Sequence, residues 1–186
     1  MITSGNIVQN DICLEGLKNR ILQMGSGELE LWKLAVISDE KVFEQIYSLI
    51  SSDDPKVAWR SCWIIDNATK DHPEMIVPLI PDIVAHLNIT QNGSLKRHFT
   101  RILCRHNIPE ELLVQVVDRC FKLLSPVEAV AVRANAMQLL FNISQCEPGL
   151  KQELASVIEN LLEEGGTAGF MNRAEKLVRK LNDNGS

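Results

Sequence analysis

The stretch KVAWRSCWIIDNATK, residues 56–70, decides the fold because its pattern occurs four times in the chain. When Val57 is aligned with Leu95, Val132 and Phe170, the four segments lie 38, 37 and 38 residues apart. In each segment the fifth position is small or apolar, and the eighth and ninth positions are aliphatic. One helical pattern that recurs at this length is typical of a solenoid of stacked helix pairs.

Further helices are expected before and after these segments in the sequence, because apolar residues recur there at three- and four-residue steps. Residues 1–38 are predicted to form an N-terminal cap with helices at 9–24 and 28–37. Four helix pairs are predicted over 39–182, followed by a tail at 183–186. The helices of these pairs are expected at 40–51 and 56–70, 73–87 and 93–106, 110–124 and 127–145, and 149–164 and 167–181.

Proline and aspartate residues mark several of the expected helix ends. The turn Ser52-Asp53-Asp54-Pro55 offers a cap and a first-turn proline to the helix at 56–70. Pro78 and Pro81 lie inside the helix expected at 73–87, so that helix should be kinked or interrupted.

The totals indicate one compact domain of residues 1–186. Hydrophobic residues make up 45% and charged residues 23%, and the net charge of -5 argues against indiscriminate binding to nucleic acid or to anionic membranes. No apolar run reaches the roughly 18 residues of a membrane span, and no secretory leader is expected. Five widely spaced cysteines fit a reducing compartment, so a cytoplasmic location is expected.

Two stretches carry a family resemblance. VRANAMQLLFNI, residues 132–143, resembles the second helix of HEAT repeats, and MIVPLIPDIVAHL, residues 75–87, resembles their proline-bearing first helix. The chain thus resembles a small, bacterial-type HEAT-repeat protein with degenerate repeats over about 40–181. The resemblance implies an all-α, right-handed α–α superhelix of about ten helices with no sheet. It also implies a concave side lined by second helices, and protein interaction as the commonest role.

The sequence departs from the family at the arginine position of the second helix. That column reads Ala58, Lys96, Arg133 and Met171. A regular arginine–aspartate ladder between repeats is therefore not expected.

A basic face is predicted on the second helices. At about 100° per residue, positions three, four, seven and eleven lie opposite the apolar positions. They include seven Arg or Lys residues, one His and no acid, whereas most acids fall in first helices. The candidate binding residues in these columns are Trp59, Arg60, Trp63, Asn67, Arg97, His98, Arg101, Arg105, Asn135, Gln138, Asn142, Arg173, Lys176 and Lys180.

Two interpretations of this face stay open. A concave wall of one charge would attract an acidic peptide or protein segment. Alternatively, the cations are simply solvated. Trp59 and Trp63, one turn apart, either form an aromatic platform for a ligand or pack internally, with Trp32 as one possible neighbour.

Nucleic-acid binding is the competing class. Some alkylpurine DNA glycosylases combine a HEAT-like stack with a basic channel, tryptophans and an essential aspartate, and Asp66 lies close in sequence to Trp63. No catalytic motif supports this or any lyase activity. His98, Cys104 and His106 lack zinc-ligand spacing, so no metal and no cofactor are expected.

The sequence therefore predicts a non-enzymatic interaction scaffold, monomeric or weakly dimeric, that binds an acidic protein segment. A DNA-binding protein would differ from it in the steep salt dependence of its affinity for duplex DNA.

Overall fold

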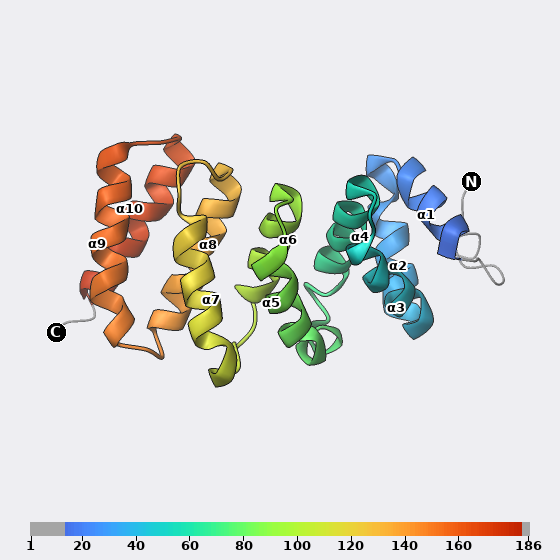
Figure 1. Ribbon diagram of the computed structural model, residues 1–186, viewed down its shortest axis with the longest axis horizontal. Helices are drawn as coiled ribbons and strands as arrows, with labels where there is room; N and C mark the ends of the chain where they lie inside the picture. Colours follow the sequence, from blue (N-terminus) through green and yellow to red (C-terminus); the bar gives the residue numbers. More distant parts are fainter. Residues whose placement is uncertain (1–13, 184–186) are drawn as a thin grey trace. The chain divides into compact units, whose positions relative to one another are not determined.

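The computed structural model describes residues 14–183 (Figure 1). Over this range the chain forms ten α-helices and several short 3₁₀ helices, and no strand. The predicted all-α class is therefore confirmed. The start of the helix expected at 9–24 falls outside the described residues.

The chain divides into two compact units, with the boundary between Leu79 and Ile80. The α-helices of the first unit are α1 (Leu14–Gln23), α2 (Leu29–Ser38), α3 (Glu40–Ser48) and α4 (Pro55–Ala68). Its 3₁₀ helices are Ser26–Glu28, Leu49–Ser51, Pro73–Met75 and Val77–Leu79. The second unit contains α5 (Ile80–Ile89), α6 (Gly93–Leu103), α7 (Glu110–Leu123), α8 (Val130–Ser144), α9 (Gly149–Glu164) and α10 (Ala168–Asp183).

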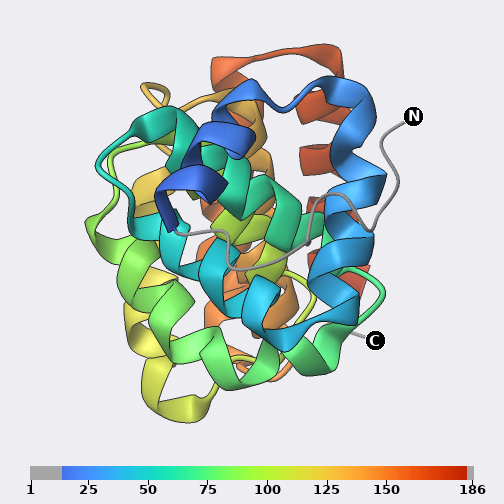
Figure 2. The ribbon, with the colours of Figure 1, turned by 90° about the vertical axis from the view of Figure 1, so that its right-hand side faces the viewer.

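Helix α4 is the centre of the first unit, since it packs against α1, α2 and α3. Figure 2 turns the ribbon so that the helices of this unit, blue to teal, face the viewer. The Asp54 carboxylate accepts hydrogen bonds from the backbone N–H groups of Lys56 (2.8 Å) and Val57 (3.2 Å), and Pro55 occupies the first turn. The predicted cap is thus confirmed. It fixes the start of α4 and with it the face that buries Ile64 and Ile65.

The prolines interrupt the segment expected as a helix at 73–87. Two 3₁₀ helices precede α5, which starts only at Ile80 and continues to Ile89. Pro81 then lies in the first turn of α5, where a missing backbone N–H costs no helical hydrogen bond. The predicted interruption is confirmed.

The second unit is built in two layers. Helices α6, α8 and α10 pack in sequence in one layer, and α5 packs against α7 in the other. Helix α8 contacts α6, α7, α9 and α10, so these four helices shield its apolar side chains from solvent. Met137, Leu139 and Leu140 are buried there accordingly.

Cation–glutamate pairs connect successive repeats of this unit. Lys96 on α6 pairs with Glu128, which precedes α8. Arg133 on α8 pairs with Glu164 at the end of α9, with 3.9 Å between Arg133 Nη2 and Glu164 Oε2. Arg133 also donates from Nε to the Leu124 carbonyl (2.9 Å), and its guanidinium lies 4.7 Å from the Phe170 ring centroid. The family's arginine column therefore does form inter-repeat pairs at two positions, with glutamate as the acid.

Pairing with Lys96 depends on a turn that the helical pattern did not predict. Helix α8 begins at Val130 instead of residue 127, and Glu128 lies in the turn before it. Helix α6 likewise ends at Leu103, before the expected end at residue 106. Helix α9 begins and ends where it was predicted.

Candidate functional site

The predicted basic face of α6 is only partly at the surface. Arg97 and Arg101 are exposed, and Arg105 is half-buried. His98 is buried, with 1% of its surface exposed, so its prediction as a surface binding residue is wrong. On α6, position four lies at the edge of the predicted face, and the packing of neighbouring helices buries His98 there.

Three amide side chains of α8 bind to one another or to α6. Asn135 Nδ2 donates to the carbonyl of Arg97 (3.1 Å), and Asn142 Nδ2 donates to the carbonyl of Cys104 (2.9 Å). Gln138 Nε2 donates to Asn142 Oδ1 (2.9 Å). Asn135 and Asn142 therefore join two second helices of the layer. Sequence reasoning missed this role, although Arg97–Asn135 and Cys104–Asn142 are each 38 residues apart, close to the 37-residue offset of these two segments.

All three cations that α10 contributes to the predicted face are at the surface. Arg173, Lys176 and Lys180 are exposed, and with Gln138 of α8 they line a hollow of about 350 Å³. Its other lining residues are Gly169, Asn172 and Leu177. Arg173 donates to the carbonyl of Ala134 (3.4 Å), and the Lys180 ammonium lies 5.9 Å from the Phe141 ring centroid. The structure thus gathers residues from α8 and α10 around one concavity, which the sequence pattern did not define.

The α4 residues of the predicted face have structural contacts. Arg60 donates from Nη1 to the carbonyls of Ile21 (2.7 Å) and Leu22 (2.8 Å), near the end of α1. It thereby satisfies backbone acceptors that the helix end leaves open. Asn67 donates to the carbonyl of Trp63 within its own helix (2.7 Å). Arg60 is half-buried and has this capping role, and its part in binding a partner stays a prediction.

Trp59 and Trp63 are half-buried, and their ring centroids lie 6.1 Å apart. The Arg60 guanidinium lies 5.7 Å from the Trp59 ring, so one cation already contacts this pair. An aromatic platform for a ligand stays a prediction. Asp66 is completely buried, so this structure does not present its carboxylate to a substrate as a glycosylase-like reaction would require.

Burial is the largest cause of the pKa shifts of Cys104, Cys120 and His106, which lie near the predicted face. Burial raises the pKa of the Cys104 thiol to about 12, although the charges of Arg173 and Arg105 oppose the shift. Burial also raises the pKa of Cys120. The pKa of His106 is lowered by burial and by the Arg105 charge. Cys104 Sγ donates a hydrogen bond to the Asn135 carbonyl (3.3 Å), which is consistent with a protonated thiol.

The cysteines should differ sharply in reactivity, because the thiolate is the nucleophile. A thiol with a pKa of about 12 is ionised in only about one molecule in ten thousand at pH 8. We expect exposed Cys146 to react with Ellman's reagent in the native protein, and Cys62, Cys104 and Cys120 to react only after unfolding.

The assay uses a Cys13→Ser variant, because Cys13 lies outside the described residues. Raising the pH from 7 to 9 should leave Cys104 unmodified, as its thiolate forms only near pH 12. Peptide mapping identifies the modified residue. Modification of Cys104 at the rate of Cys146 would contradict the prediction.

In residues 14–183 no group of three or more His, Cys, Asp or Glu side chains is placed to hold a metal ion. Within the same range, no helix combines the length and the apolar character that crossing a membrane requires.

The repeat length, the helix pairs and the inter-repeat contacts define an α-solenoid of the HEAT type. The family model of the HEAT repeat domain matches residues 21–181. This match covers most of the chain, so the protein belongs to the HEAT-repeat family, as the resemblance indicated. No significant match was found to a curated protein or to a solved structure.

Proposed function

We propose that this protein is an interaction scaffold whose basic face in the second unit binds an acidic segment of a protein partner. HEAT repeats generally mediate protein interactions, which supports the scaffold role. The observation that carries the finer proposal is the set of exposed cations on α6 and α10. We define this basic face by its exposed residues, Arg97, Arg101, Arg173, Lys176 and Lys180.

The amide hydrogen bonds between α6 and α8 favour this role, because they fix α6, which carries Arg97 and Arg101, against α8. Helix α8 in turn packs against α10, which carries the other cations. Arg97 supplies the backbone carbonyl that Asn135 binds, and the Arg97 side chain remains exposed. Exposed charges of one sign accelerate the encounter with an oppositely charged partner. They contribute less to the lifetime of the complex, and they are screened by salt.

A direct binding experiment tests the proposal with a fluorescent 12-residue peptide rich in Glu and Asp. Anisotropy should show saturable binding that weakens between 50 and 200 mM salt. Each exposed charge contact contributes about 0.2–1 kcal/mol, so loss of both contacts in Arg97→Gln/Arg101→Gln should raise Kd by about two- to thirtyfold. The control Lys122→Gln/Arg179→Gln changes the net charge equally at exposed residues outside the basic face.

A labelled DNA duplex of similar length distinguishes the competing class. An equal loss of peptide affinity in the two double variants would refute the basic face as the binding surface. Tighter binding of the duplex than of the peptide at 150 mM salt, with a steep salt dependence, would replace the protein partner by nucleic acid.

A further inference from the structure

The hollow between α8 and α10 differs from the rest of the basic face because it is a concavity with several kinds of donor. Its volume of about 350 Å³ is at the small end of the range for ligand pockets. Among its lining residues Leu177 is buried, whereas Arg173, Lys176 and Lys180 are exposed. None of the seven residues that line it is acidic.

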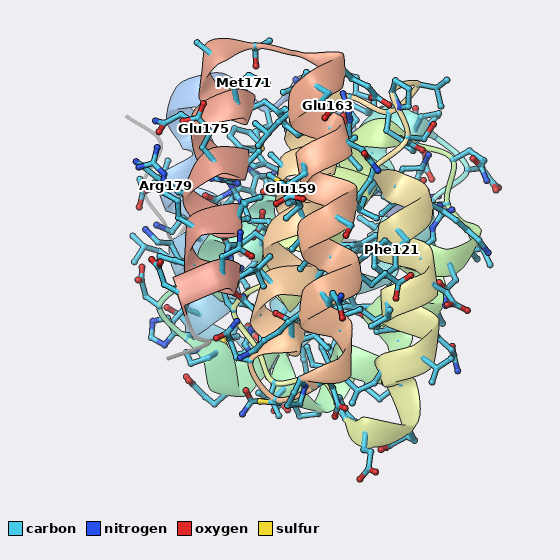
Figure 3. All side chains as sticks on the ribbon, turned by 90° about the vertical axis from the view of Figure 1, so that its left-hand side faces the viewer. Phe121, Glu159, Glu163, Met171, Glu175 and Arg179 are labelled. Atoms are coloured by element: carbon cyan, nitrogen blue, oxygen red, sulfur yellow. The ribbon has the colours of Figure 1, made fainter. Side chains whose placement is uncertain are left out.

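The acids of α10 are placed away from this hollow. Glu175 pairs with Arg179 at 3.6 Å, and Figure 3 shows both along one edge of α10. Neither residue lines the hollow. The cations of the hollow follow one another at three- and four-residue steps on α10, a spacing at which like charges repel. An anion bound among them would relieve that repulsion.

The amide groups add directed donors to these charges. A hydrogen bond from Asn142 Nδ2 to the Cys104 carbonyl orients the Asn142 side chain. Asn142 Oδ1 then accepts a hydrogen bond from one N–H of the Gln138 amide. This arrangement leaves the second N–H of the Gln138 amide for a ligand. Asn172 contributes another amide to the lining. Three cations and two amides match a group that has several acceptor oxygens and more than one negative charge.

We propose that this hollow binds a phosphate monoester on a phosphorylated side chain of the partner segment. A phosphate monoester carries about 1.5 to 2 negative charges and three strong acceptor oxygens, whereas a carboxylate carries one charge and two oxygens. The Arg173 guanidinium suits bidentate contact with the phosphate oxygens, and Lys176 and Lys180 supply further charge. This inference rests on the proposed function and names the group that the acidic segment carries.

Three peptides of one acidic sequence test the proposal, with phosphoserine, glutamate or serine at the central position. Binding to the full chain is measured by anisotropy and by amide chemical shifts in NMR. We expect the phosphoserine peptide to bind about tenfold more tightly than the glutamate peptide. Inorganic phosphate should shift the same α10 amides, but with an affinity at least about tenfold below that of the phosphopeptide.

Two variants with opposite designs locate the site. Arg173→Gln/Lys176→Gln removes two charges from the hollow and should weaken phosphopeptide binding by about tenfold or more. Gly169→Glu keeps the cations and places a carboxylate at the lining; a Cβ at Gly169 meets no atom within 4 Å, so the fold should tolerate it. It should also abolish the preference for phosphoserine.

Matched controls keep these results interpretable. Lys122→Gln/Arg179→Gln also removes two positive charges, as Arg173→Gln/Lys176→Gln does, but at positions outside the hollow. Gly149→Glu places the same charge on α9, where an added Cβ also meets no atom within 4 Å. Both controls should keep the preference for phosphoserine, and melting curves verify that every variant is folded.

Several outcomes would overturn the inference. Equal binding of the phosphoserine and glutamate peptides, with the proposed basic face still required, would refute the phosphate site and leave the proposed function intact. Binding of inorganic phosphate as tightly as the phosphopeptide would refute a peptide-borne ligand. Failure of all three peptides to bind would refute both proposals. A single-stranded oligonucleotide that binds more tightly than the phosphopeptide, and depends on Arg173 and Lys176, would identify a nucleic acid as the source of the phosphate.

Discussion

Replacing Leu140 with alanine is expected to lower the free energy of unfolding by about 2–5 kcal/mol. Leu140 is completely buried on α8, the helix that contacts α6, α7, α9 and α10. Removal of its branched end loses apolar burial and leaves a cavity that four neighbouring helices can close only in part. Urea denaturation followed by circular dichroism measures the loss.

The matched control is Val114→Ala on α7, which shortens an aliphatic side chain that is 72% exposed. It should change the free energy of unfolding by less than about 0.5 kcal/mol. Because the chain has two compact units, the analysis needs a probe in the second unit, such as the amide resonances of α8. A Leu140→Ala protein as stable as Val114→Ala would show that the repeat register is wrong.

Breaking the Lys96–Glu128 pair is expected to have an effect of similar size. The Lys96 side chain is 6% exposed and that of Glu128 is 16% exposed, so each charge is largely removed from water. Lys96→Met leaves the glutamate without its cation, which should cost about 3 kcal/mol. This is the lower end of the range for buried pairs, because Glu128 keeps some contact with solvent.

The double variant Lys96→Met/Glu128→Leu separates pairing from burial. It removes both charges and should be more stable than Lys96→Met alone, since apolar replacements of buried pairs are often neutral. A double-mutant cycle by urea denaturation gives the coupling energy. If the losses in free energy of unfolding of Lys96→Met and Glu128→Leu simply add in the double variant, the residues do not stabilise the fold as a pair.

The helices and several of their ends were predictable because local chemistry determines them. Periodic apolar residues indicated where the helices lie, and the turn at residues 52–55 indicated the start of α4, where Asp54 is the cap. Pro78 and Pro81 predicted the interruption before α5 for the same local reason, since a proline restricts its own backbone and that of its neighbour. The family also followed from residues adjacent in sequence, and the match over residues 21–181 confirmed it.

The sequence by itself determined the repeat length, the helical class and which columns of the second helices are rich in cations. Only the tertiary structure decided which side chains in those columns reach solvent. Arg60 caps α1, His98 is buried, and Asn135 binds the backbone of α6, whereas Lys176 lines a hollow. The physical reason is that exposure and hydrogen bonding depend on helices that lie 30 to 40 residues away in the chain, while helical periodicity records only the direction of each side chain on its own helix.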